Sequence, residues 1–276
     1  MKIGLISSIF LANANALIPH PLGAYLNLTS YPTSVGHAVS DLDQTLKFYH
    51  DILGLIVLHQ DEESVDNPAY GQLTNTSGAT YKTAVVAIPN QLWTLNLVEY
   101  IGLPREQIKQ REQDPGDPGL TLTVKNSSAI NNALRAANMT TILDEPVPEG
   151  GAEGTTSTVW VYDPDGYDSL GFVGTIFNMS ADTQWAAVTG NCDPDTRCEY
   201  YEYDAPDRVS IIYPAQYPGV GITSYNVKDL DGIVEKVRAA GLAIITQGDT
   251  PLMVDGRRSI VVRDPSGYLV RLDEEL

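Results

Sequence analysis

The stretch SVGHAVSDLDQTLKFYHDILGL, residues 34–55, decides the fold. Its first six residues alternate small side chains with larger ones, a pattern typical of a strand with two different faces. After Asp41, a favoured N-cap residue, apolar side chains recur at helical spacing until Gly54 ends the pattern. The stretch therefore predicts a strand followed by a helix over residues 41–52.

The same order of elements recurs along the chain. Strands are predicted at residues 55–58, 80–88 and 93–100, which completes a first strand-helix-strand-strand-strand unit. A second unit is predicted to have a helix at residues 128–137 and strands at 120–124, 140–143 and 158–162. A third unit is predicted to have a helix at residues 231–240 and strands at 220–227, 243–246 and 259–263. The second and third units run into Asp-Pro-x-Gly turns at Asp163 and Asp264. The interval from helix cap to turn is 37 positions from Asn126 and 35 from Asp229, which indicates an internal repeat.

These residues and turns resemble the vicinal oxygen chelate superfamily, which includes glyoxalase I, extradiol dioxygenases and bleomycin-resistance proteins. The similarity covers residues 33–102, 117–175 and 218–275. It implies an α+β fold of repeated βαβββ units in tandem, which form cupped mixed sheets with the helices outside. One fold of this kind hosts many chemistries, so the activity does not follow from the resemblance.

Four segments are predicted along the chain. Residues 1–16 are predicted to be a signal peptide, because Lys2 precedes an apolar run and Ala14-Asn15-Ala16 matches a small-x-small cleavage site. Residues 17–32 form an N-terminal arm, 33–175 a first domain of two paired units, and 176–276 a second, partly eroded domain. Residues 176–217 show no clear amphipathic helix and are either an eroded fourth unit or a long insertion.

Several features are consistent with a secreted protein or one in the lumen of the secretory pathway. Cys192 and Cys198 are six positions apart, which favours a local disulfide over two unpaired thiols. Five Asn-x-Ser/Thr sequons are candidate glycosylation sites: Asn27, Asn75, Asn126, Asn138 and Asn178.

The charge of the chain limits its partners. Lys and Arg number 17 against 35 Asp and Glu, a net charge of -18, so nucleic acid and anionic membrane surfaces would be repelled. No stretch after the N-terminal run has the ~18 consecutive apolar residues that a membrane helix needs. The expected partner is a small hydrophobic or aromatic metabolite with a carbonyl group, and the resemblance allows a homodimer.

The resemblance also implies where a metal would bind. Metal-using members place a His or Gln at the start of the first strand of a unit and a Glu in its last strand. The matching positions here are Ser34, Gly119, Ile222, Asn96, Leu170 and Arg271. These residues are poor ligands for a divalent ion, which prefers carboxylate or imidazole, so we expect a metal-independent member without a cofactor. His37 is predicted to face the helices as a hydrogen-bonded core residue, because strand alternation turns it away from the cup.

The candidate site follows from the cup-facing positions. Arg271, Asn96 and His59 are the candidate catalytic residues. The candidate substrate-binding residues are Ser34, Thr94, Thr121, Thr123, Ser224 and Asn226. A run of tyrosines at residues 200–203 is either a stacking wall for an aromatic ligand or strand packing.

Three functions fit this site. The first is a secreted, metal-independent cyclase or isomerase of natural-product biosynthesis, most specifically an intermolecular hetero-Diels-Alderase. The second is a protein that binds and sequesters a hydrophobic metabolite without catalysis. The third is a divergent metal-dependent lyase or dioxygenase, whose site would be rebuilt from Glu99, His59 or His37.

Overall fold

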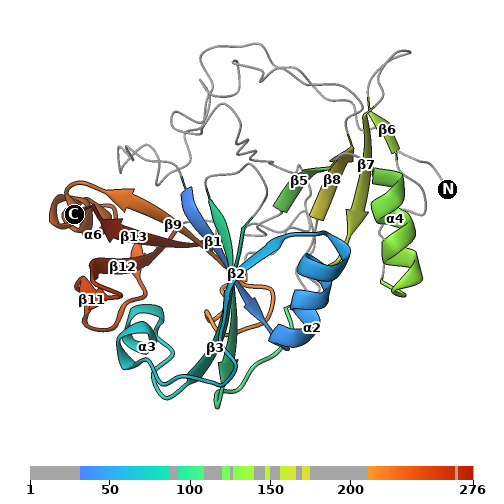
Figure 1. Cartoon of the computed structure of the whole chain (residues 1–276). Helices are drawn as coiled ribbons and strands as arrows, with labels where there is room; N and C mark the ends of the chain where they lie inside the picture. Colours follow the sequence, from blue (N-terminus) through green and yellow to red (C-terminus); the bar gives the residue numbers. More distant parts are fainter. Residues whose placement is uncertain are drawn as a thin grey trace, which may run out of the picture.

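The computed structural model describes residues 32–87, 93–108, 120–124, 127–139, 147–149, 156–165, 170–174, 211–264 and 267–275. The signal peptide and almost all of the N-terminal arm lie outside these ranges, as does the strand predicted at 140–143. Two sheets with helices packed against them make up the described fold, which confirms the α+β class (Figure 1). None of the helices in these ranges combines the length and the apolar character that a membrane crossing requires.

The first unit begins with the predicted strand and helix. Asp41 caps the helix, since its carboxylate accepts a hydrogen bond from the Gln44 amide at 2.9 Å. Gly54 follows the helix with a φ of 76°, the left-handed conformation that glycine adopts readily. The elements are β1 (Pro32–Val39), α2 (Leu42–Leu46), its continuation as the π-helix η1 (Lys47–Ile52), β2 (Ile56–Gln60), α3 (Pro68–Thr74), β3 (Thr80–Ala87) and β4 (Thr94–Ile101).

The last unit repeats this plan. Asp229 caps its helix by accepting from the Gly232 amide at 2.9 Å. The elements are β9 (Gly221–Val227), α6 (Leu230–Ala239), β10 (Ala243–Ile244), the 3-10 helix η2 (Gln247–Asp249), β11 (Leu252–Val254), β12 (Arg257–Arg263) and β13 (Leu269–Glu274). Residues 211–220, which precede this unit, contain no strand.

The second unit forms a smaller sheet of its own. Its elements are β5 (Leu120–Val124), α4 (Ser127–Ala136), β6 (Val147–Glu149), β7 (Thr156–Val161) and β8 (Leu170–Gly174). The strand order in this sheet is β5-β8-β7-β6, with β5 and β8 parallel.

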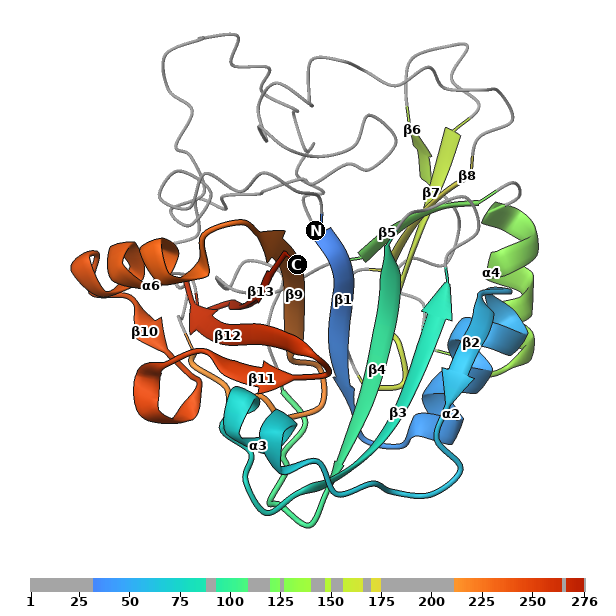
Figure 2. The same ribbon diagram turned by 60° about the vertical axis from the view of Figure 1, so that its left-hand side comes forward.

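The pairing of the units differs from the expected pairing. The large sheet has the order β10-β12-β13-β9-β1-β4-β3-β2, with β11 on β12, so the first unit shares its sheet with the last unit and not with the second. The junction is the antiparallel pair of β1 and β9, in which Ser34 lies opposite Ser224. Figure 2 shows these strands as one curved sheet. The expectation of a cup formed within residues 33–175 is therefore wrong, although the boundaries of the domains themselves stay a prediction.

The two faces of the curved sheet have different partners. On the outer face, Leu95 and Leu97 of β4 pack with Leu42 and Phe48 of the first helix, and a second cluster joins α6 to β12 and β13. On the concave face, α3 contributes Tyr70 and Thr74 to the wall of the cup. The Thr246 hydroxyl donates to the Leu73 carbonyl at 3.0 Å and ties α3 to the last unit. The concave face is where the site lies.

Candidate functional site

A cavity of about 420 Å³ lies on the concave face of the large sheet. Its walls come from both paired units, since Gly36 and Asn96 contribute from the first unit and Ile222, Ser224 and Arg271 from the last. These residues share one face because side chains along a strand alternate between its two sides. A cavity of this volume is large enough for a small organic molecule.

Arg271 is the strongest positive charge in the cavity wall, and its position is fixed. Its Nε donates to Oδ1 of Asp273 at 2.8 Å and its Nη2 donates to Oγ of Ser259 at 3.3 Å. Ser259 also donates to Asp273, the residue opposite it in the pair of β12 and β13. Arginine has five N–H donors, and these bonds use two of them, so the guanidinium can still donate to an oxygen of a ligand.

The residues at the expected metal-ligand positions of the cup do not fit a divalent ion. Asn96, Ile222 and Arg271 all line the cavity, and Ser34 is buried beside it on β1. Isoleucine has no donor atom, and a guanidinium repels a cation. Glu99 does not replace them, because its Oε2 accepts from the Leu42 amide at 3.1 Å on the outer, helix-covered face.

Aromatic side chains from α3 and β3 form another part of the wall. Tyr70 and Tyr81 line the cavity, with ring centroids 5.0 Å apart and nearly perpendicular planes. The Tyr70 hydroxyl lies 3.3 Å from that of Tyr100. Burial raises the pKa of Tyr70 and Tyr81 and raises that of Tyr100 well above its ordinary value, so all three remain neutral phenols near pH 7. The tyrosines predicted as a stacking wall, Tyr200, Tyr201 and Tyr203, lie outside the described residues.

His59 and Asp61 lie together at the mouth of the cavity. Nε2 of His59 is 3.0 Å from Oδ1 of Asp61, while Oδ2 of Asp61 accepts from the Thr83 amide at 2.9 Å and the Thr83 hydroxyl at 2.6 Å. Partial burial favours the protonated carboxyl, but these hydrogen bonds and the nearby imidazole outweigh it and lower the pKa of Asp61. Asp61 is therefore a fixed carboxylate next to an accessible imidazole.

The predicted substrate-binding residues separate into three groups. Ser224 lines the cavity, and Thr94 donates to Oδ1 of Asn96 at 3.1 Å on the same face. Asn226 is hydrogen bonded to Arg257 at 3.0 Å. Thr121 and Thr123 belong to β5 in the smaller sheet, so the expectation that they share this cup is wrong.

The predicted covalent modifications stay predictions. Cys192, Cys198, Asn27, Asn126 and Asn178 lie outside the described residues. Asn75 and Asn138 are exposed and adopt a positive φ just after α3 and α4. Both side chains are therefore on the surface, where a glycan could be carried.

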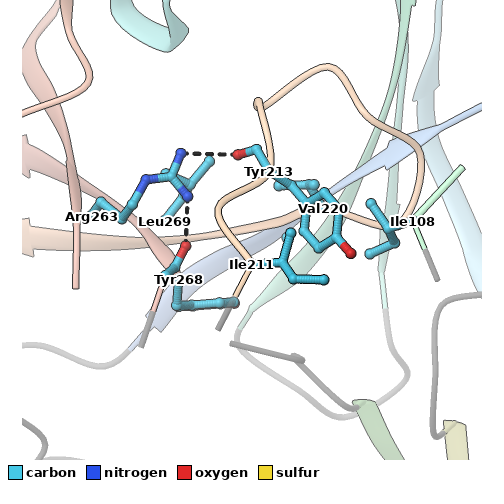
Figure 3. Close-up of a pocket in the computed structure, with 10 residues that line it drawn as sticks. Ile108, Ile211, Tyr213, Val220, Arg263, Tyr268 and Leu269 are labelled. Carbon is cyan, nitrogen blue, oxygen red and sulfur yellow. Dashed lines mark hydrogen bonds between the residues drawn. The ribbon is translucent and has the colours of Figure 1, made fainter. Parts of the chain in front are cut away.

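The second hollow in the described part of the chain is too small for a ligand. It has a volume of about 20 Å³, about one water molecule. Figure 3 shows Arg263 within it, donating to the backbone carbonyls of Tyr213 at 2.9 Å and Gly267 at 2.7 Å. This arginine stabilises a loop and does not line the cup.

His37 lies on the opposite side of β1 from the cup, as predicted, in a buried polar cluster. Its Nε2 is 2.7 Å from Oδ2 of Asp163, which also accepts from the Tyr49 hydroxyl at 3.1 Å. Asp165 accepts from the Ser40 amide at 2.7 Å and the Thr45 hydroxyl at 2.9 Å. These three are the one group of metal-ligand residue types brought close together in the described ranges. Their oxygens already accept hydrogen bonds, and we interpret the cluster as a tie between the first and second units.

The electrostatics of this cluster favour a charged imidazole. Burial alone disfavours the cation, but the charges of Asp163 and Asp165 and the hydrogen bond to Asp163 together raise the pKa of His37 above its ordinary value of 6.5. Burial and the neighbouring charge of Asp163 raise the pKa of Asp165 as well. In both cases the fold favours the protonated form.

The free energy of unfolding is therefore expected to fall as the pH rises above about 6.5. A group whose pKa is raised by folding stabilises the fold fully below its unfolded pKa and loses that contribution as the pH rises through its folded pKa. Urea unfolding of the wild-type protein and of His37→Gln, from about pH 6 to about pH 9, measures this. The difference between the two proteins should narrow with pH, and a difference that is constant or widens would contradict the charged cluster.

Comparison with known proteins agrees with this geometry. The family model described as Glyoxalase/Bleomycin resistance protein/Dioxygenase superfamily matches residues 33–169. The fold is similar to glyoxalase I from Zea mays, at 15% identity over 91% of this chain and 95% of that chain with a TM-score of 0.58. A variant of the same maize enzyme has 16% identity over 92% of this chain and 96% of that chain, also with a TM-score of 0.58. No curated protein matches the chain significantly. The structural similarity shows the fold alone, and the reaction has to be inferred from the residues that line the cup.

Proposed function

Because this chain belongs to the Glyoxalase/Bleomycin resistance protein/Dioxygenase superfamily, also called the vicinal oxygen chelate superfamily, we propose that it is a small-molecule enzyme of the isomerase or cyclase type whose cup needs no metal ion. The observation that carries the proposal is the guanidinium of Arg271, which Asp273 and Ser259 hold in the wall of the cavity. Members of the superfamily that use a metal ion place a carboxylate ligand at the position that Arg271 occupies in this chain.

A fixed guanidinium can take over one task of a metal ion, the stabilisation of negative charge on an oxygen. A donor that is already oriented needs no rearrangement when charge develops on a carbonyl oxygen, and its effect is stronger in a partly desolvated cavity than in water. Arginine matches a carboxylate or a carbonyl oxygen well, because its N–H groups form a rigid fork. Arg271 is therefore the residue that would bind the oxygen end of the substrate.

Part of the wall suits an apolar or aromatic body, although Asp61 and Asp255 also place two carboxylates in the lining. Val98, Ile222 and Val261 line the cavity beside the rings of Tyr70 and Tyr81. Pockets of this composition bind ligands mainly by burial of apolar surface, with a few polar groups that fix the orientation. The substrate class is an apolar or aromatic compound with a carbonyl or carboxylate oxygen.

The proposal is tested with the conjugated enones benzylideneacetone and chalcone and the purified, chelator-treated protein. Calorimetry measures binding, and mass spectrometry with NMR measures conversion. We expect binding, with conversion of an enone that fits the cup. Bound compounds that all return unchanged would favour the sequestering protein instead. Conversion that appears only after a divalent metal is added would favour the metal-dependent alternative, and failure of every compound to bind would overturn the proposal.

The finer parts of the sequence-based hypothesis remain predictions. An intermolecular hetero-Diels-Alder reaction needs two reactants held in a reactive pose, which can by itself lower a barrier by several kcal/mol, on the order of 7 or more in favourable cases. The secretory location, the natural-product role and the homodimer are not tested by the geometry of the cup.

A further inference from the structure

Two walls of the cup carry complementary chemistry. His59 lies on β2, the edge strand of the large sheet, and Asp61 directly follows that strand. Arg271 lies on β13, and β3, β4, β1 and β9 lie between these two strands. All three residues line the same cavity, to which strands from both ends of the large sheet contribute. The imidazole of His59 and the guanidinium of Arg271 therefore line different ends of one cavity.

Asp61 is held in a position that orients His59. Its Oδ2 accepts two hydrogen bonds from Thr83, one from the amide at 2.9 Å and one from the hydroxyl at 2.6 Å, and this leaves Oδ1 directed at Nε2 of His59 at 3.0 Å. When Nε2 donates its hydrogen to this carboxylate, Nδ1 carries the lone pair and can accept a proton. A carboxylate that fixes the tautomer and orientation of an imidazole is the arrangement of a general base.

We propose that His59 is the acid–base catalytic residue of the cup and that Asp61 is its positioning residue, in a proton-transfer isomerisation of a carbonyl compound bound at Arg271. The inference rests on the proposed function and deepens it, because it names the reaction type and the group that moves the proton. Histidine most often serves this role in enzymes, and Asp61 supplies the orienting partner that such a histidine requires.

The reaction balances without an oxidant or a co-reactant. Nδ1 of His59 accepts a proton from a carbon next to the carbonyl, and the electron pair of that C–H bond moves into the carbonyl to form an enolate. The guanidinium of Arg271 stabilises the negative oxygen. The imidazolium then returns the proton. Return to the same carbon can invert the configuration of that carbon, and return to the far end of a conjugated system moves the double bond.

The test measures proton transfer with phenylpyruvate in D₂O. This compound offers a carboxylate and a keto oxygen to Arg271 and a benzylic CH₂ whose hydrogens exchange through the enolate. NMR gives the exchange rate at saturation and calorimetry gives the Kd, for the wild-type protein, His59→Ala and Asp61→Asn. His50→Gln is the matched control, because His50 is also exposed but hydrogen bonds to the Leu55 carbonyl at 2.7 Å, away from the cavity.

We expect the wild-type protein to accelerate exchange and His59→Ala to lose roughly 100-fold of that acceleration, the lower end of what a general base contributes. The Kd and the unfolding temperature should stay close to those of the wild type. Added imidazole should restore part of the exchange in His59→Ala and none in Arg271→Gln. Asp61→Asn should lower the exchange rate without weakening binding, and Asp61→Glu should recover most of it.

The outcomes distinguish failure of the acid–base role of His59 from failure of the proposed function. Phenylpyruvate that binds without faster exchange, or exchange that His59→Ala leaves intact, would overturn the acid–base role and leave the proposed binding cup standing. An equal loss in His50→Gln would also overturn it, as an effect common to surface histidines. If neither phenylpyruvate nor the enones bind, the proposed function itself fails.

Discussion

Replacement of Arg271 by glutamine is expected to weaken the binding of cinnamate about 30-fold, equivalent to about 2 kcal/mol for a charge-assisted hydrogen bond. The binding of cinnamamide, which has the same shape and no charge, should weaken much less. The reason is that Arg271 is the cation that Asp273 and Ser259 present to the cavity, while the rest of the ligand contacts apolar and aromatic wall. Isothermal titration of both compounds with both proteins measures the difference.

The control for this experiment concerns Asp273, which is buried and would lose the guanidinium of Arg271 and keep only the Ser259 hydroxyl as a partner in Arg271→Gln. The double variant Arg271→Gln with Asp273→Asn removes this buried charge and should show the same loss of cinnamate binding. Arg257→Gln is the matched surface control, because Arg257 is exposed and bonds to Asn226 without lining the cavity. An equal loss for cinnamate and cinnamamide, or a loss in Arg257→Gln, would show that Arg271 does not recognise the ligand oxygen.

Replacement of His37 by alanine is expected to lower the free energy of unfolding by about 3 to 5 kcal/mol. The change would leave Asp163 and Asp165 buried together without the imidazole that faces them, and an uncompensated buried charge is costly. Folded proteins of this kind are stable by only about 5 to 15 kcal/mol, so a large fraction of the total would be lost. Urea unfolding followed by circular dichroism measures the effect.

A double-mutant cycle with Asp163→Asn assigns the effect to the pair. The combined variant should be less destabilised than the sum of the two single changes, since removal of both charges leaves none unpaired. Tyr49→Phe removes only the hydroxyl that bonds to Asp163 at 3.1 Å and should cost about 1 kcal/mol. Strict additivity of His37→Ala and Asp163→Asn would contradict the cluster as a tie between units.

Local signals predicted the elements of each unit well. The capping residues Asp41 and Asp229, Gly54 after the first helix and the alternation along β1 all act within a few residues, so they can be recognised in the sequence. The alternation also placed His37 on the helix side correctly. The short helix α3 was missed, although Asn67 followed by Pro68, a cap and a favoured first helical residue, was a usable signal.

The pairing of units could not be predicted in the same way. A repeat shows that each unit has a first strand, but any two such strands can pair along their free edges, and the choice depends on packing over the whole chain. Here β1 pairs with β9, more than 180 residues later, so the cup joins the first and last units. For the same reason the sequence placed Thr121 and Thr123 in the cup although β5 lies in the other sheet.

The candidate site was predicted in part. Arg271 and Asn96 were identified from positions that the resemblance implies, His59 from its place near the end of a strand and Ser224 from strand alternation. All four line the cavity. Tyr70 was missed because α3 was missed, whereas Tyr81 alternates along β3 with Thr83 and Val85, which also line the cavity, so strand alternation was a usable signal for it. The pairing of His37 with Asp163 and Asp165 was also missed, since it joins residues 126 positions apart that only the tertiary structure brings together.

A crystal structure with bound 4-bromocinnamate tests the central claim most directly, because the anomalous signal of bromine locates the ligand independently of the protein. We expect bromine inside the cup of the large sheet and the carboxylate within hydrogen-bonding distance of the Arg271 guanidinium, about 3 Å. A ligand bound outside this cavity, or within it with the carboxylate directed away from Arg271, would show that Arg271 does not bind the oxygen end of the ligand.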